Sequence, residues 1–302
     1  TNAGNSIYEK GLTANNTGRA TAQLLVAPAP ARDLVVADIL VPTTGNAGEQ
    51  RVVQWTVTNI GDATATGPWT DRIYLSLDGT LNGATLLASV VRSTGLAPNA
   101  GYTGSTSVSL PDLADGSYRI VVVADASTQV FEDGREANNT LASTATLTLT
   151  HPDLDVTGVT VPTLPNSGTS FNVQWTVENA GSGPAGGTWI DTLWLSRDGI
   201  VGADDFKLAD VVRAGPLSIG GAYTGSTSIT LPLDANGTYQ LLVVADSGNA
   251  VRELTAGELN NLGSALLEVA LAPYADLRVS GVVAPTETIG DPAEVTIRWT
   301  VD

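Results

Sequence analysis

The sequence predicts an all-β fold made of repeated domains. Apolar and polar residues alternate at 53–58 and again at 173–178, as expected for strands with one buried and one solvated face. Gly, Pro, Asn and Asp residues separate such segments and are typical of turns. Apolar residues do not recur at the three-and-four spacing that a long amphipathic helix requires, so we expect sheets alone.

A unit of about 120 residues recurs along the chain. Its landmarks are an Asp-Leu pair followed by a tryptophan, found at Asp33, Asp153 and Asp276 and at Trp55, Trp175 and Trp299. The predicted domains are two full units at 31–150 and 151–270, the C-terminal part of a preceding repeat at 1–30, and the N-terminal strands of a following repeat at 271–302. Since the chain has no Met and begins within the pattern, we interpret it as a piece of a longer protein.

Each full unit is expected to contain about seven short strands. In the first unit these are expected at 34–41, 53–58, 71–77, 85–92, 103–110, 117–124 and 142–149. Seven strands in about 120 residues is the size of an immunoglobulin-like or fibronectin-like β-sandwich. Trp55 and Trp175 are predicted to lie in the core between the two sheets.

The composition argues against several classes of function. The 302 residues carry a formal charge of −17, which opposes binding to nucleic acid and to anionic membranes. The apolar runs are too short to span a bilayer. The absence of Cys and the single histidine, His151, leave thiol chemistry, Cys-ligated zinc and the common catalytic triads without their residues. We therefore predict a protein that is not an enzyme.

Four short motifs recur in a fixed order. They are an opening Asp-Leu-x-Val segment with a proline some nine residues on, a WTVxN strand end, a YLSxDG or WLSxDG strand, and an acidic loop that ends in NN. Together they resemble the CARDB family, the cell-adhesion-related domains of bacterial and archaeal surface and secreted proteins. The resemblance implies a β-sandwich used in tandem as a non-catalytic module of large exported proteins. It implies no shared ligand site.

The closing loop FEDGREANNT at 131–140 is a candidate metal site. Asp125, Glu132 and Asn138 offer the oxygen ligands that calcium prefers. Alternatively the loop is a structural clamp, in which Asn and Asp side chains bond to nearby backbone. The related loops at 8–17 and 252–261 keep the glutamate and the amide pair but differ in spacing, which favours the clamp.

A second candidate calcium site is the segment SRDGIVGADD at 196–205, where Asp198, Asp204 and Asp205 could converge. The first unit has no acids that match Asp204 and Asp205, so any metal here would occupy one unit only. The alternative, which we favour, is a Gly-containing turn that follows a strand.

Two tryptophans with neighbouring acids form a third candidate. Trp69 with Asp71, and Trp189 with Asp191, would bind sugars if the indoles were exposed for stacking. The alternative, which we favour, is that both indoles pack into the fold with their N–H groups satisfied.

The function expected from these observations is that of a non-catalytic spacer segment of a large exported bacterial surface protein or adhesin. The alternative is a carbohydrate-binding or accessory array of a secreted hydrolase. The expected partners are adjacent repeats of the parent chain and a surface glycan or protein ligand, with calcium as the one candidate cofactor. The expected location is extracellular, either secreted or at the cell surface.

Overall fold

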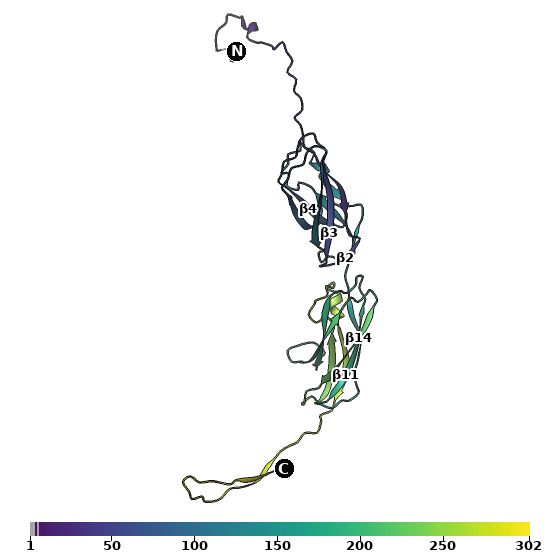
Figure 1. Ribbon diagram of the computed structural model, residues 1–302, viewed down its shortest axis with the longest axis vertical. Helices are drawn as coiled ribbons and strands as arrows, with labels where there is room; N and C mark the ends of the chain where they lie inside the picture. The colour runs from purple at the N-terminus through teal and green to yellow at the C-terminus, as the bar shows by residue number, and fades with distance from the viewer. Residues whose placement is uncertain (1–3, 5) are drawn as a thin grey trace.

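The computed structural model describes residue 4 and residues 6–302 and shows an elongated molecule. Two β-sandwich domains lie end to end, and the terminal segments extend from the two opposite ends (Figure 1). Within the described residues there are no α-helices, only three short 3-10 turns, η1 (Thr13–Asn15), η2 (Glu136–Asn138) and η3 (Gly257–Leu259). None of the described helical segments is long and apolar enough to cross a membrane. The all-β prediction is confirmed.

The first domain contains two facing sheets. Its strands are β1 (Leu34–Leu40), β2 (Thr44–Asn46), β3 (Gln50–Asn59), β4 (Trp69–Ser76), β5 (Thr85–Arg92), β6 (Gly101–Ser109), β7 (Gly116–Val123), β8 (Thr140–Ala142) and β9 (Leu147–Thr150). One sheet has the order β1-β3-β6, and the other has the order β2-β9-β7-β4-β5, with β8 also paired to β7. Apolar residues that alternate along these strands fill the space between the sheets.

The second domain repeats this arrangement. Its strands are β10 (Leu154–Thr160), β11 (Ser170–Asn179), β12 (Thr188–Ser196), β13 (Phe206–Ala214), β14 (Ala222–Thr230), β15 (Gly237–Val244) and β16 (Leu262–Val269). One sheet has the order β10-β11-β14, and the other has the order β13-β12-β15-β16. Trp55 and Trp175 are both 1% exposed, so the predicted core positions are confirmed.

The first domain departs from the predicted strands in two places. Strand β2, which pairs in parallel with β9, was not predicted. It is only three residues long, too short to show the alternation of apolar and polar residues by which a strand is recognised. The expected strand at 142–149 is broken into β8 and β9. The Ser143 hydroxyl causes part of this break, because it donates to Ala145 O at 2.6 Å and accepts from Ile120 N at 3.1 Å.

The terminal segments contribute little to either core. Residues 16–30 are exposed apart from Asn16. At the other end, β17 (Val279–Val283) and β18 (Arg298–Val301) form an antiparallel pair on their own. Trp299 on β18 is 60% exposed, in contrast to its two buried counterparts. A two-stranded ribbon has no second sheet to cover its apolar residues.

Candidate functional site

The acidic loop of the first domain brings three carboxylates together. Asp125 and Glu132 are buried and Glu136 is half-buried, and each offers an oxygen atom that lies within 4.8 Å of the others. The loop runs from the end of β7 to the start of β8 and includes η2. Asp125 has a left-handed backbone conformation, with φ of 44°, which non-glycine residues rarely adopt. Its carboxylate accepts hydrogen bonds from the next loop amides, Gln129 N at 2.8 Å and Val130 N at 2.7 Å.

Glu132 is held by hydrogen bonds from two directions. Leu34 N on β1 donates to Glu132 Oε2 at 3.0 Å, and Asn139 Nδ2 donates to Glu132 Oε1 at 3.2 Å. The same amide nitrogen donates to Glu136 Oε2 at 3.0 Å. Asn139 is 2% exposed, and its Oδ1 has no hydrogen-bond partner among the residues that the structure describes. A buried amide oxygen without a partner therefore lies beside a group of carboxylates.

The electrostatics of this group disfavour its charged form. Burial raises the pKa of Glu132 to about 7, against its ordinary value of 4.5, although the bonds from Leu34 and Asn139 lower it. Burial is also the main cause of the raised pKa of Asp125 and of Glu136. Burying like charges close together costs free energy, so the group would gain stability from protons or from a cation.

Asn138, the third residue of the predicted calcium site, makes a structural contact through its amide nitrogen, while its buried Oδ1 has no hydrogen-bond partner among the described residues. Its Nδ2 donates to Asp33 Oδ1 at 2.7 Å and thereby ties the loop to the start of β1. Arg135 Nε lies 3.7 Å from the other oxygen of Asp33. These contacts are those of the structural clamp, and they involve the Asp of the opening motif and the first Asn of the closing pair.

The second domain places related residues at the same end of its sandwich. Asp246 has a φ of 45° and accepts hydrogen bonds from Ala250 N at 2.9 Å and Val251 N at 2.7 Å, as Asp125 does in the first domain. Asn260 Nδ2 donates to Asp153 Oδ1 at 2.9 Å, which matches the contact between Asn138 and Asp33. The clamp is therefore present in both domains.

Glu253, the counterpart of Glu132, is held less well. It is 5% exposed, and no hydrogen bond of ordinary length and angle reaches its carboxylate within the described part of the chain, where the Leu154 amide is the one group that favours its charged form. Burial raises the pKa of Glu253 to about 8, the Leu154 amide lowers it, and the charges of Glu258, Asp153 and Asp246 raise it further. Asn261 Nδ2 donates to Glu258 Oε2 at 3.3 Å.

The segment SRDGIVGADD does not gather its acids. Asp198 Oδ1 accepts from Ser196 Oγ and Ile200 N, both at 3.0 Å, and Asp205 accepts from Gly202 N at 2.7 Å. Among the described residues, the group of three close acidic ligands does not include Asp198, Asp204 or Asp205. The arrangement is that of a side-chain-capped turn.

The tryptophan and acid pairs are buried parts of the core. Trp69 is 0% exposed and Trp189 is 2% exposed, so neither presents a face to a sugar, and the predicted packing role is confirmed. Trp69 Nε1 donates to Tyr102 Oη at 3.3 Å. The Tyr102 hydroxyl in turn donates to Asp71, which also accepts from Trp55 Nε1 at 2.8 Å. The Arg92 guanidinium covers the Tyr102 ring at 3.9 Å from its centroid.

The second domain repeats this network with Trp175, Trp189, Asp191, Arg213 and Tyr223. Trp175 Nε1 donates to Asp191 Oδ2 at 2.8 Å, and the Tyr223 hydroxyl donates to the same oxygen at 2.8 Å. Burial raises the pKa of Asp191. Burial and the charge of Asp191 raise the pKa of Tyr223, so its hydroxyl keeps its proton and remains a donor.

The network explains why the repeated word YTGSTS contains a glycine. Gly104 lies opposite Trp55 in the register of β3 and β6. A Cβ atom at Gly104 would lie 2.3 Å from the Trp55 indole, and one at Gly225 would lie 2.2 Å from the Trp175 indole. Only a residue without a side chain leaves room for the ring there.

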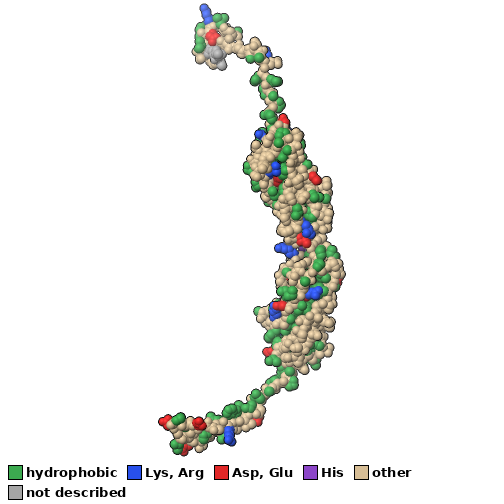
Figure 2. Space-filling view, viewed as in Figure 1, with side chains coloured by type: hydrophobic (Ala, Val, Ile, Leu, Met, Phe, Trp, Pro, Cys, Tyr) green, Lys and Arg blue, Asp and Glu red, His purple; other side chains and the backbone are tan. Residues whose placement is uncertain are grey.

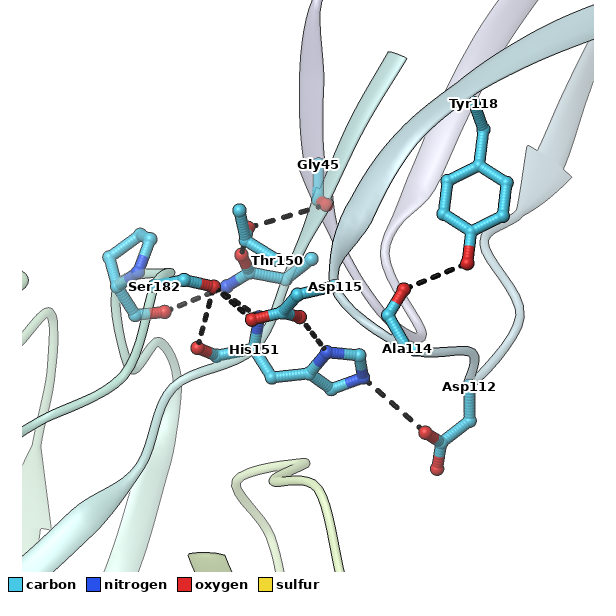
Figure 3. A network of polar contacts seen from close by, with 10 residues as sticks. Gly45, Asp112, Ala114, Asp115, Tyr118, Thr150, His151 and Ser182 are labelled. Carbon is cyan, nitrogen blue, oxygen red and sulfur yellow. Dashed lines mark hydrogen bonds and ion pairs between the residues drawn. The ribbon is translucent and has the colours of Figure 1, made fainter. Parts of the chain in front are cut away.

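The joint between the domains is short and hydrogen-bonded, as the close-up view shows (Figure 3). Three residues separate β9 from β10, and the first of them, His151, is 2% exposed. Its Nδ1 lies 2.6 Å from Asp115 Oδ1, and its Nε2 lies 3.3 Å from Asp112 Oδ1. The Ser182 hydroxyl of the second domain donates to Asp115 of the first.

Two further contacts cross the joint. Asn46 Nδ2 donates to Pro184 O at 2.8 Å. The Arg252 side chain lies against Gly48, so closely that a Cβ at Gly48 would be 2.7 Å from Arg252 Cδ. Figure 2 shows basic and acidic side chains together at this narrow waist. The acidic loop of the second domain therefore lies at the joint.

The sequence analysis identified the amide pairs, which include Asn139 and Asn261, but assigned no ligand role to them or to Glu136 and Glu258. A signal for them exists, since Glu136 precedes Asn139 by three residues and Glu258 precedes Asn261 by three. This equivalence is hard to see in the sequence because Glu136 follows the shared glutamate by four residues, whereas Glu258 follows it by five.

The comparison with protein families identifies the chain. Residues 31–143 and residues 151–265 each match the CARDB family. Since these ranges make up most of the chain, it belongs to the CARDB family and contains two tandem CARDB domains. CARDB domains are adhesion-related, non-catalytic modules.

Solved structures of similar proteins include a CARDB domain from Pyrococcus furiosus. Its crystal structure in complex with di-metal ions is 21% identical, with a TM-score of 0.31, and the match covers 41% of this chain and 97% of that one. Its solution NMR structure is 22% identical, with a TM-score of 0.31, covering 40% and 97%. Red sea bream transglutaminase is 15% identical, with a TM-score of 0.27, covering 80% of this chain and 32% of that one. No curated protein sequence matches the chain.

Proposed function

We propose that the two domains form a spacer within an array of CARDB repeats, and that this array belongs to an exported bacterial surface protein. The observation that carries this proposal is the joint. Ser182 of the second domain bonds to Asp115 of the first, and Asn46 of the first domain bonds to Pro184 of the second. A three-residue connection with hydrogen bonds on both sides restricts bending more than a flexible linker does.

The net charge of −17 also supports an extended array. Like charges on adjacent domains repel at low ionic strength, which opposes a side-by-side arrangement. The proposed location is outside the cell, and the proposed neighbours are adjacent repeats of the parent chain, with a glycan or protein as ligand of the whole array.

The carbohydrate-binding alternative loses its two main residues. Trp69 and Trp189 lie in the cores of their domains, so sugar binding would need other aromatic side chains. We therefore retain the spacer as the proposed function.

Calcium is the proposed cofactor, bound in the first domain by the carboxylates of Asp125, Glu132 and Glu136. Rotation of the Asn139 amide by half a turn would direct its unpartnered oxygen toward the same ion. Carboxylate and amide oxygens are the ligands that Ca²⁺ takes in proteins. The observation behind this assignment is the convergence of three carboxylates within 4.8 Å.

The spacer is tested by measuring the distance between the domains. The chain has no native Cys, so Leu77→Cys and Leu233→Cys, at residues that are 71% and 84% exposed, accept spin labels cleanly. We expect one narrow distribution at a long distance. Asp115→Ala should broaden it, whereas Asp38→Ala, at an exposed position on β1, should not. A short distance, from domains that lie side by side, would contradict the spacer.

A further inference from the structure

Two equivalent arginines lie at the edges of the sheets with donors that the fold leaves unused. The Arg92 guanidinium covers the Tyr102 ring at 3.9 Å from its centroid, and Arg213 covers the Tyr223 ring at 3.8 Å. Both arginines are half-buried, and the Nε of each is buried without a hydrogen-bond partner among the described residues. A buried donor without an acceptor costs free energy, so each position suits an acceptor from outside the fold.

The fold uses the charge of these arginines but not their hydrogen-bonding geometry. Burial raises the pKa of Asp191, and hydrogen bonds and the charge of Arg213 lower it. Among the described residues, the ion pairs of arginine are those of Arg51 and Arg135, so neither Arg92 nor Arg213 contacts a carboxylate directly. The planar fork of a guanidinium matches a carboxylate with two parallel hydrogen bonds, and this capacity is free in both domains.

In the first domain the arginine lines a cavity between the two sheets. The cavity has a volume of about 220 Å³, which is room for several waters, at about 30 Å³ each, or for one carboxylate side chain. Its lining comes from residues 90–94 at the end of β5, residues 102–104 of β6, Trp55 and Asp71. A carboxylate that entered it would lie beside Arg92 and the hydroxyl-bearing residues Ser93, Thr94 and Thr103.

The strand that carries Arg92 is an open edge of its sheet. Strand β5 is paired with β4 and stands at the end of the sheet order. Its register with β4 is regular from Ala88 to Arg92, and Arg92 is its one charged residue. Val91 is 66% exposed. An edge without protecting charges accepts a further strand through its free backbone N–H and C=O groups.

The equivalent edge of the second domain is protected by charge. Strand β13 carries Lys207 and Asp210, which form an ion pair of 2.7 Å. Asp210 stands opposite Thr192 as Ser89 stands opposite Arg72, so an acid occupies the position of a serine. Charged side chains on an edge strand oppose the addition of another strand, and a negative charge opposes an acidic partner in particular.

We propose that the first domain binds an extended peptide as an added strand on β5, with a carboxylate side chain of that peptide in the cavity beside Arg92. Backbone hydrogen bonds to residues 88–92 would supply affinity, and the guanidinium fork would select the carboxylate. The net charge of −17 opposes unspecific binding of an acidic peptide elsewhere on the chain. The inference is independent of the spacer function.

The test is a titration of the isotope-labelled full chain with the peptide acetyl-Thr-Val-Glu-Val-Thr-amide, followed by NMR. The blocked ends leave the glutamate as its one carboxylate. The amides of residues 88–92 and the Trp55 indole N–H should shift along one saturable curve, whereas the Trp175 indole should not shift. The same peptide with Gln in place of Glu should bind at least about tenfold more weakly, because it cannot form a charged pair with Arg92.

Three variants separate the proposed contact from stability. Arg92→Lys keeps the charge but lacks the planar fork, and should weaken binding of the glutamate peptide by about tenfold. Ser89→Asp introduces the charge of the second domain and should weaken binding as well. Arg213→Lys makes the same change in the other domain, is the matched control and should leave binding unchanged. Far-UV circular dichroism checks that each variant folds.

The proposed site fails if the glutamate peptide does not bind saturably, if the two peptides bind equally, or if Arg92→Lys and Arg213→Lys have the same effect. Glutarate and galacturonate distinguish a strand from a carboxylate alone. If either of them shifts the Trp55 indole as strongly as the peptide does, and the peptide leaves the amides of residues 88–92 unmoved, the partner is not a peptide strand and the proposal is wrong.

Discussion

The two domains share their buried polar network but differ at their acidic loops. The Trp55 to Asp71 and Trp175 to Asp191 bonds are both 2.8 Å. In the acidic loops, by contrast, Glu132 accepts hydrogen bonds from Leu34 and Asn139, whereas within the described residues no hydrogen bond of ordinary length and angle reaches Glu253. The core network has to fit between two sheets, while the loop lies at an end of the sandwich.

A single additional residue accounts for this difference. Glu132 precedes Asn139 by seven residues, and Glu253 precedes Asn261 by eight. The longer loop still reaches Asp153 through Asn260, but its Asn261 amide bonds to Glu258, whereas Asn139 bonds to both Glu132 and Glu136. The bond between the first Asn of the pair and the opening Asp is therefore kept when the loop lengthens. The hydrogen bonds around the shared glutamate are not kept.

The largest expected effect is at the core tryptophans, where the two domains should behave alike. Trp55→Ala and Trp175→Ala should each lower the free energy of unfolding of their own domain by about 3 to 5 kcal/mol. Chemical denaturation followed by circular dichroism measures both. Trp194→Ala, at a half-buried position on β12, is the control and should cost clearly less. A large loss in one domain only would break the equivalence of the two cores.

The next largest loss of stability is expected at the buried acids that accept from the core tryptophans. Asp71→Ala and Asp191→Ala would each leave a buried indole N–H and a tyrosine hydroxyl without their acceptor, which should cost about 2 to 3 kcal/mol. Equilibrium denaturation compares them with Asp38→Ala on an exposed strand position, which should be near neutral. If Asp71→Ala also proved neutral, the network would not stabilise the fold.

The smallest effect separates the two loops by their pH dependence. In the folded protein without metal, burial raises the pKa of Glu132 to about 7 and that of Glu253 to about 8, from an ordinary value of 4.5. The folded state therefore binds more protons than the unfolded state above pH 4.5. Stability should fall as the pH rises from about 5 to 8, by about 1 to 3 kcal/mol per domain and more in the second.

Denaturation in EDTA at pH 5 and pH 8 measures this fall. Glu132→Gln and Glu253→Gln should each remove most of the decrease in their own domain, because a neutral amide cannot lose a proton. Glu178→Gln, an exposed acid on β11, should leave the decrease unchanged. Equal decreases in the wild type and in both loop variants would show that other acids are responsible.

The sequence by itself determined the architecture of this protein. The alternation around Trp55 and Trp175, the repeated unit and the turn residues predicted strands, a sandwich and the family, because the period of a half-buried strand is written in neighbouring residues. The acidic loops were identifiable as candidate sites because their glutamate and amide pair recur along the chain. The domain limits 31–150 and 151–270 stay predictions.

The tertiary structure alone decided which residues meet. Glu132 bonds to Leu34, 98 positions away, and Asn138 bonds to Asp33, 105 positions away. The group of carboxylates includes Glu136, and the joint buries His151 beside Asp115. Such contacts depend on how two sheets and two domains are placed in space, and sequence spacing carries no information on them when loops differ in length. The burial of Trp69, which removes it from sugar binding, is also a result of the tertiary structure. The alternation of residues along a strand does not say which face of the strand is covered.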